Sequence, residues 1–160
     1  MSFQNQFTKT TTDANLMETV HHGSAEYPFR YYYENIALFD FKCIDWHWHS
    51  ELEFIYIESG NVVFDIGTVH FELNEGNGIM INSKILHRLQ SSSDAIIPNF
   101  LFQPSFIAPQ DSLIYKKYIN PVISSSLEYL VFQPDIPWQK KALEIIKTII
   151  AVRSEERRVG

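Results

Sequence analysis

Polar and apolar side chains alternate in short runs over much of the chain, and turn-forming residues separate these runs. Alternation at every second residue is typical of a strand with one buried face. The glycines of Ser59-Gly60 and Gly76-Asn77-Gly78 supply the backbone freedom that tight turns need. The pattern therefore predicts an all-β barrel. Its strands are expected at residues 52–58, 61–66, 69–73, 79–82 and 86–90.

A further apolar run, over residues 95–107, predicts another strand, in which Pro98 and Pro104 favour a sheet edge or a bend. The pattern then changes: residues 112–119 indicate a short helix that ends at Asn120-Pro121. We expect the barrel to be complete before this change.

A clearer helix follows, because Asp135 can cap its start and Pro137 suits its first turn. The apolar stripe of this helix is larger than a solvent-facing helix needs. It predicts that one side of the helix packs on the barrel and that another side forms a dimer contact. The apolar residues at helical spacing are Trp138, Ala142, Ile145, Ile146 and Ile149.

Length and composition limit the class of protein. The chain has 160 residues, enough for one domain with its own core, and a formal charge of −6, which opposes binding to nucleic-acid phosphates. Its lone Cys43 rules out an internal disulfide, and its start lacks the pattern of a signal peptide. No apolar run approaches the roughly 18 residues of a membrane span. We expect a cytoplasmic protein.

The chain divides into four segments. Residues 1–26 are rich in Thr, Asn and Gln and predict a flexible N-terminal arm, whose adjacent His21 and His22 would point to opposite faces and are given no role. The barrel is expected over 27–110 and a truncated helical dimerisation segment over 111–152. The last segment, 153–160, resembles a vector-derived tail.

Three imidazoles and a carboxylate stand at spacings that one small barrel can gather. His47 and His49 share a strand face because they are two residues apart, Glu53 has the same parity, and His87 follows the later glycine turn near a strand entry. Such a set suits Zn, Fe, Ni or Mn, and it equally suits hydrogen bonds to a sugar hydroxyl or an organic acid.

The order of these residues resembles the first cupin motif, HxH, three residues, Glu, six residues and Gly, which Gly60 completes. The second cupin motif is matched in part, since Asn82 stands where proline is common. The resemblance implies a mainly β fold: a cupin-like double-stranded β-helix, or jelly-roll, barrel followed by C-terminal helices.

A longer part of the chain, about residues 20–150, resembles the N-terminal sensor domain of AraC-family transcription regulators. The resemblance is carried by residues 22–29, 46–56, 78–83 and 112–121. In that family a cupin-like barrel binds a small effector, an arm can fold over the pocket, two helices dimerise, and a separate C-terminal domain binds DNA. This implies a homodimer that contacts DNA only through a domain absent from the chain, and no membrane partner.

The predicted ligand-binding residues are the four cluster residues together with Trp48 and Tyr56, although aromatic residues in a small barrel are more often core. In the family that the chain resembles, the HxH and Glu residues persist without a known catalytic metal. The resemblance therefore favours no cofactor, and a bound divalent transition metal is the alternative. His70 and Arg88 are expected to serve ordinary surface contacts. The full ligand-binding set is His47, His49, Glu53, His87, Trp48 and Tyr56.

These observations favour an effector-sensing and dimerisation domain that binds a small polar metabolite such as a sugar. No nucleophile motif or phosphate loop is present, and we predict no enzyme activity and no catalytic residue. Two alternatives stay open. One is a small metal-dependent cupin enzyme, an isomerase or oxygenase, and the other is a binding barrel without a regulatory role.

Overall fold

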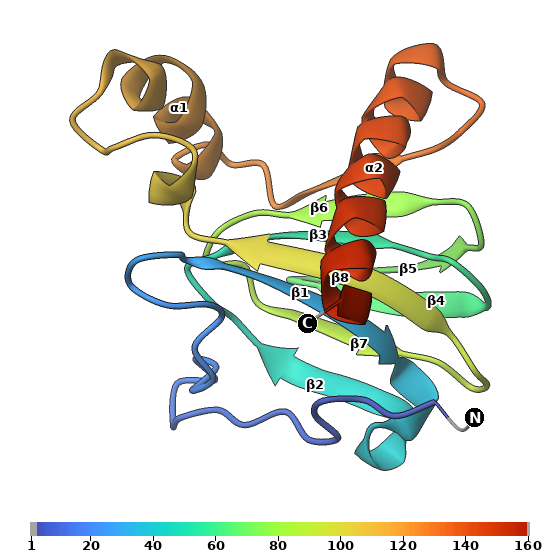
Figure 1. Ribbon diagram of the computed structural model, residues 1–160. Coiled ribbons are helices and arrows are strands. Elements are labelled where there is room, and N and C mark those ends of the chain that lie inside the picture. The colour runs from blue at the N-terminus through green and yellow to red at the C-terminus, as the bar shows by residue number, and fades with distance from the viewer. Residues whose placement is uncertain (1–2, 160) are drawn as a thin grey trace.

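Two antiparallel sheets face each other in the computed structural model, which describes residues 3–159 (Figure 1). The first sheet has the order β1 (Phe29–Asn35), β8 (Ile96–Phe102), β3 (Leu52–Tyr56), β6 (Gly78–Ile81) and β9 (Tyr129–Phe132). The second has the order β2 (Cys43–His47), β7 (His87–Gln90), β4 (Asn61–Ile66) and β5 (Val69–Asn74). The predicted mainly β, cupin-like architecture with C-terminal helices is confirmed.

The main core lies between the two sheets. Alternation along each strand decides which side chains enter it: in β6, Ile79 and Ile81 are fully buried inside, whereas Met80 joins a second apolar cluster on the outer face. Other members of the inner core are Ile55, Ile57, Val62, Phe64, Ile66, Leu89 and Ile97.

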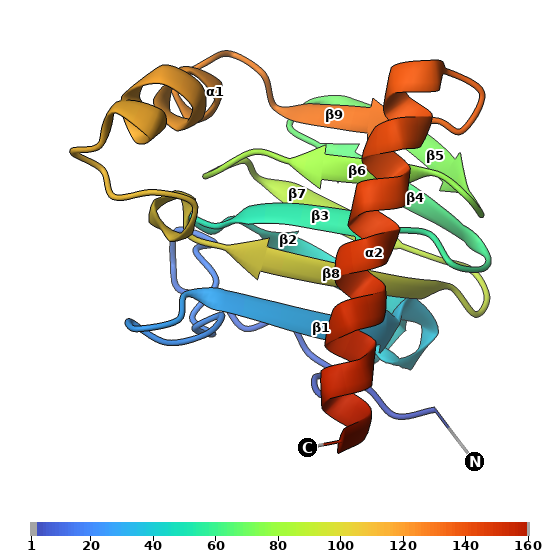
Figure 2. The same cartoon turned by 45° about the horizontal axis from the view of Figure 1, so that its top comes forward.

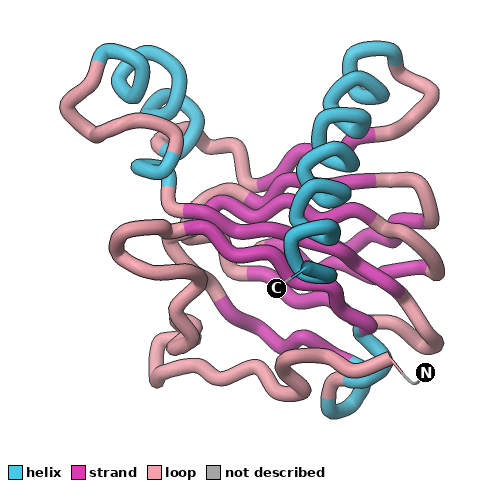
Figure 3. Tube along the Cα trace, in the orientation of Figure 1, coloured by secondary structure: helices cyan, strands magenta, loops and turns pink. Residues whose placement is uncertain are grey.

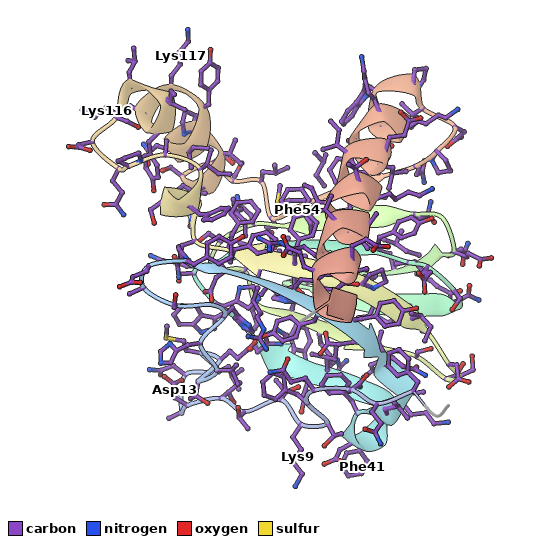
Figure 4. All side chains as sticks on the ribbon, in the orientation of Figure 1. Lys9, Asp13, Phe41, Phe54, Lys116 and Lys117 are labelled. Atoms are coloured by element: carbon purple, nitrogen blue, oxygen red, sulfur yellow. The ribbon has the colours of Figure 1, made fainter. Side chains whose placement is uncertain are left out.

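Helix α2 (Pro137–Val159) crosses the outer face of the five-stranded sheet (Figure 2). Leu143, Ile146 and Ile150 pack there against the second cluster, which includes Phe100. Phe54, labelled in Figure 4, lies between the sheet and this helix. The apolar stripe therefore covers the sheet as predicted. Among the described residues, no helix is long and apolar enough to cross a membrane.

Of the two alternatives for the run at residues 95–107, a bend is present, because the strand ends at Phe102 and Pro104 begins a short helix, but the edge position is wrong. Strand β8 pairs with β1 on one side and with β3 on the other, so it lies inside the sheet. Pro98 lies opposite Tyr33, one residue outside the stretch that pairs with β3, so its missing N–H costs that pairing no hydrogen bond. A strand that the sequence pattern did not predict, β9, pairs with β6 and extends this sheet.

The short helices connect strands at the ends of the barrel. The predicted helix end at Asn120-Pro121 is wrong, because the helical backbone of residues 115–119 continues through Pro121 to Ile123. Asn82, at the position where cupins often have proline, donates from its amide to the carbonyls of Val122 (3.0 Å) and Leu127 (2.7 Å). The helices are η1 (Ile36–Leu38), η2 (Asp40–Lys42), η3 (Pro104–Phe106), the π-helix η4 (Tyr115–Ile119) and α1 (Asn120–Ile123).

The N-terminal arm runs as loop past the lower sheet, beside β2 (Figure 3). A short turn in it is closed by the carboxylate of Asp13, which accepts from the backbone N–H groups of Asn15 and Met17. Met17 also forms a parallel bridge with Trp48. The later part of the arm therefore docks on the barrel, while its flexibility stays a prediction and residues 1–2 lie outside the described part.

Gly60, the glycine of the first motif, turns the chain from β3 to β4 with a φ of +85°. A Cβ atom at this position would lie 2.4 Å from the carbonyl oxygen of Asp94 and 2.9 Å from the Cα atom of Ala95. Both the positive φ and the close approach of backbone explain why glycine stands here.

Candidate functional site

Four buried side chains meet near one end of the barrel. His47 ends β2 and lies opposite His87, the first residue of β7, in the same sheet. Glu53 comes from β3 in the facing sheet, and His49 lies in the segment that connects the two sheets. One ligand atom from each residue lies within 4.8 Å of the others. Strand parity alone does not bring Glu53 to the histidines, because the chain changes sheet after His49.

The three histidines share one hydrogen-bonding pattern. Nδ1 of His47 donates to the carbonyl of Asp45 (2.7 Å), and Nδ1 of His49 donates to the carbonyl of Glu51 (3.0 Å). Nδ1 of His87 likewise donates to the carbonyl of Ile85 at 2.7 Å. A carbonyl oxygen only accepts, so each Nδ1 carries hydrogen and each neutral ring would present an Nε2 lone pair to the centre.

Glu53 is the acidic centre of the group. Its Oε2 lies 3.1 Å from Nε2 of His49 and 3.2 Å from Nε2 of His87. Burial favours the neutral acid, but the hydrogen bonds and charges of these two rings outweigh it and hold the pKa of Glu53 well below its usual value. The carboxylate is therefore charged inside the barrel.

The histidines respond in opposite directions to this environment. Burial disfavours the charged form of His49, but the hydrogen bond and charge of Glu53 prevail and raise its pKa to about 9. Burial, reinforced by the nearby His87, lowers the pKa of His47 to about 3. Without metal, the cluster therefore combines a protonated His49 with a neutral His47.

These residues fit a divalent transition metal. They offer three imidazole nitrogens and one carboxylate oxygen, and the Nδ1 hydrogen bonds fix the ring orientation as the outer partners of metal-bound histidines do. Two ligands about 2.1 Å from an ion lie at most about 4.2 Å apart, so inward shifts of a few tenths of an ångström per side chain would close the set. A metal would also displace the proton from His49.

A second set of polar side chains lines the same cavity, those of Asn99, Glu34, Tyr32 and His22. The amide of Asn99 donates to a carboxylate oxygen of Glu34 at 3.0 Å, and burial raises the pKa of Glu34 to about 7. The hydroxyl of Tyr32 lies 2.7 Å from Nδ1 of His22. The cavity thus contains both acids and imidazoles, a combination that recognises a polar molecule rather than a hydrocarbon.

The arm contributes a third carboxylate. One oxygen of Glu18 lies 2.6 Å from Nε2 of His22, and the other lies 3.4 Å from Nε2 of His47. Burial favours the neutral acid, but the contact with His22 prevails and lowers the pKa of Glu18. With the arm in place the cavity holds about 50 Å³. A buried water needs about 10–15 Å³ of such space, so there is room for only a few waters.

Comparison with known proteins decides the family. A family model described as the AraC-like ligand binding domain matches residues 26–109, which include the cluster. The chain belongs to this family. Over 140 residues, or 86% of the chain, it is 32% identical to the uncharacterized HTH-type transcriptional regulator YdeC of Bacillus subtilis. The match covers 47% of that relative, so the chain spans about half its length.

Solved structures resemble the AraC-like domain at lower identity. A cupin-2 domain protein from Shewanella frigidimarina is 14% identical, with a TM-score of 0.41 over 46% of this chain and 69% of that one. The Bacillus subtilis oxalate decarboxylase, studied for its Mn(II) centres, is 16% identical, with a TM-score of 0.37 over 51% of this chain and 27% of that one.

Three residues predicted to bind ligand do not line the cavity of the AraC-like domain. His87 lies behind the lining and contacts the carboxylate of Glu53, which does line it. Tyr56 lies in the outer apolar cluster, where Nζ of Lys147 is 5.5 Å from the centre of its ring. Trp48 instead holds the arm, since its indole N–H donates to the carbonyl of Asn15 at 2.9 Å. Alternation explains Tyr56, because Glu53 and Ile55 face inward from the same strand.

Two surface residues follow the sequence analysis. The ring of His70 is largely exposed and contacts Asp65, as expected for a local polar partner. Arg88 donates to the same carboxylate through Nε (3.2 Å) and an η nitrogen (3.0 Å), and its guanidinium stacks over Trp46. Neither residue lines the cavity.

Sequence reasoning missed most of the residues that line the cavity of the AraC-like domain. His22 and its neighbour His21 do point apart, as expected, but His22 is buried and reaches the site. The missed residues with polar groups inside the cavity include Glu18, His22, Tyr32, Glu34 and Asn99. The available signal was a polar residue in an apolar run: Asn99 stands within a strand whose other residues are mostly apolar.

Proposed function

We propose that this chain is the effector-sensing and dimerisation domain of an AraC-family transcription regulator that acts in the cytoplasm. The supporting observation is a buried cavity lined by imidazole, carboxylate and amide groups inside the segment that matches the ligand-binding family. Such groups exchange hydrogen bonds with a small polar metabolite, and a sugar is the first class to test. On this proposal the domain carries out no reaction.

Binding of the metabolite would control a DNA-binding part of a longer protein. The matched relative is about twice as long as the aligned region and is named as an HTH-type regulator. The chain itself has a formal charge of −6, so DNA contacts would come from the further part. An effector controls DNA binding only if it prefers one of two arrangements of the whole protein.

The competing function, a metal-dependent cupin isomerase or oxygenase, rests on the same histidine cluster. A bound metal with open positions can position a ligand without reacting with it, so metal content alone does not separate the two functions. Turnover of a small substrate that disappears with His49→Ala would favour the enzyme. Metal without turnover is compatible with a metal-assisted sensor.

A metabolite screen tests the sensor directly. Sugars, sugar acids and other small polar metabolites are added to the purified chain, and stabilisation is followed by thermal unfolding. A true effector should lose its effect in Asn99→Leu, which removes the buried amide, and should keep it in the control His70→Ala. The same compound should then change DNA binding by the longer regulator. A hit that is insensitive to Asn99→Leu, or that leaves DNA binding unchanged, would contradict the proposal.

The dimerisation proposal now rests on part of the predicted stripe. Ile146 is 3% exposed and belongs to the core, and Ala142 and Ile149 pack beside it. Trp138 and Ile145 are 56% and 60% exposed, so they are the residues of the predicted stripe that are available to a second copy of the chain. The proposed contact is accordingly the outer side of the helix.

A further inference from the structure

The arm delivers the Glu18 carboxylate into the cavity by way of a defined backbone arrangement. The N–H of Glu18 donates to the carbonyl of Trp48 at 2.9 Å, and the N–H of Trp48 donates to the carbonyl of Leu16 at 3.0 Å. Thr12 bridges to Glu18 across the turn of the arm. The carboxylate is thus held in place by main-chain bonds on both sides.

The surroundings of this carboxylate form a subsite for an acid group. Its side chain is only 12% exposed, although it belongs to a surface arm, and it contacts imidazoles of His22 and His47 that are each 5% exposed. The cavity already contains Glu34 and Glu53. A third buried carboxylate is costly unless a dedicated polar partner receives it, and the imidazole of His22 is that partner, because its Nδ1 faces the hydroxyl of Tyr32 and its Nε2 faces Glu18.

We propose that Glu18 occupies the place of the effector's own acid group, and that the effector is a small hydroxylated carboxylic acid. This inference rests on the proposed sensor function, since it assumes that the cavity is the effector pocket. The carboxylate of the effector would accept from Nε2 of His22, and its hydroxyl groups would donate to the acceptors Glu34 and Glu53 at the other side of the cavity.

The free volume explains why Glu18 must leave. Pockets for small metabolites measure about 300–1,000 Å³, whereas about 50 Å³ is open beside Glu18. An effector therefore competes with the arm for the same space and for the imidazole of His22. An uncharged sugar would fill the space but would leave that imidazole without the carboxylate that Glu18 supplied. The bound acid would release the arm from the cavity.

Removing the Glu18 side chain should create an acetate site. In chelator-treated Glu18→Ala protein, acetate should bind at least about tenfold more tightly than in the unaltered protein, as expected for one charge-assisted hydrogen bond. Acetamide, with the same shape but no charge, should gain much less. Glu26→Ala removes an exposed carboxylate of the same arm and should behave like the unaltered protein. Binding is measured by chemical-shift changes in NMR titrations.

Release of the arm can be followed in the unaltered chain as well, so the test does not depend on the folding of one variant. Lys9 points away from the molecule (Figure 4) and its side chain is 74% exposed. Trypsin cleavage after Lys9 requires the arm to leave the barrel locally. About 0.5 M sodium acetate should raise this cleavage rate at least about twofold over sodium chloride of equal ionic strength, and acetamide should not.

Two results would overturn the inference: equal gains for acetate and acetamide in Glu18→Ala, or an acetate affinity no higher than in the unaltered protein. Either result leaves the sensor function standing, because an uncharged effector could still enter the cavity. Conversely, a longer protein whose DNA binding ignores every metabolite would contradict the sensor function without changing the acetate result. The two failures are therefore distinguishable.

Discussion

Replacing Glu53 with glutamine removes the charge that holds a proton on His49, while the side chain keeps nearly the same size. The side chains of Glu53 and His49 are only 10% and 4% exposed, so solvent screens their interaction little. Without the negative charge, burial is left as the main influence on His49 and favours its neutral form. The perturbation therefore alters one proton-binding equilibrium in the folded protein.

The sign and size of the effect follow from the two pKa values. Below pH 6.5 both the folded and the unfolded protein hold the proton of His49, and the stabilisation is complete. Between pH 6.5 and about 9 the unfolded protein releases this proton while the folded protein keeps it, so stability falls as pH rises. The difference between the two pKa values corresponds to about 3 kcal/mol. The lowered pKa of Glu53 also stabilises the folded protein, and this contribution is present at every pH above 4.5.

Urea unfolding of chelator-treated protein at several pH values between 6 and 9.5 measures the effect. The stability advantage of the unaltered protein over Glu53→Gln should shrink by about 3 kcal/mol across this range. Glu34, whose pKa is raised to about 7, also makes stability depend on pH. Because Glu34 is present in both proteins, the difference between their stabilities largely removes its contribution. Glu72→Gln, on the exposed side of β5, should show no such trend. An advantage that stays constant or grows with pH would refute the proposed charge arrangement.

Three further predictions concern the metal, the first motif and the dimer. Zn²⁺ or Mn²⁺ at about 100 times its dissociation constant should stabilise the protein by about 2.7 kcal/mol and raise Tm by about 5–10 °C, and His87→Ala should abolish this effect. Gly60→Ala should cost about 2 kcal/mol or more in urea unfolding, whereas Gly76→Ala, with a similar φ but no heavy atom within 4 Å of the new Cβ, should cost about 1 kcal/mol. In sedimentation, Ile145→Glu should convert a dimer to a monomer, and the neighbouring exposed change Glu144→Gln should not; a monomer before mutation would remove the dimer proposal.

The strands could be predicted because their signals are local. Period-two alternation and glycine turns located the strands at residues 61–66 and 86–90 to within one residue at each end. The expected strand over 95–107 was real but misplaced in the sheet. A proline lowers the chance of an interior strand only where its missing N–H faces a partner, and the sequence does not say which residues of a strand are paired.

The candidate site was half predictable, for a similar reason. The HxH spacing and Glu53 form a motif within seven residues, and His87 follows a recognisable turn. Glu18 and His22 lack any such pattern, because they reach the cavity through an arm whose docking depends on backbone bonds to Trp48, 30 residues further along the chain. Tyr56 lies outside the cavity because alternation places it on the opposite face from Glu53.

Adjacent residues of the same strands connect the cavity to α2. In β8, Asn99 and Leu101 line the cavity, while Phe100 and Phe102 face outward into the cluster that α2 covers. In β3, Glu53 faces the cavity and its neighbour Phe54 faces the helix. One strand thickness therefore separates the proposed effector from the helix. A ligand that shifts Asn99 or Glu53 must shift the strands on which α2 rests, and close packing transmits such shifts rather than absorbing them. On the proposed function, ligand binding in the cavity would therefore alter the contact between two copies of the chain at the outer side of α2.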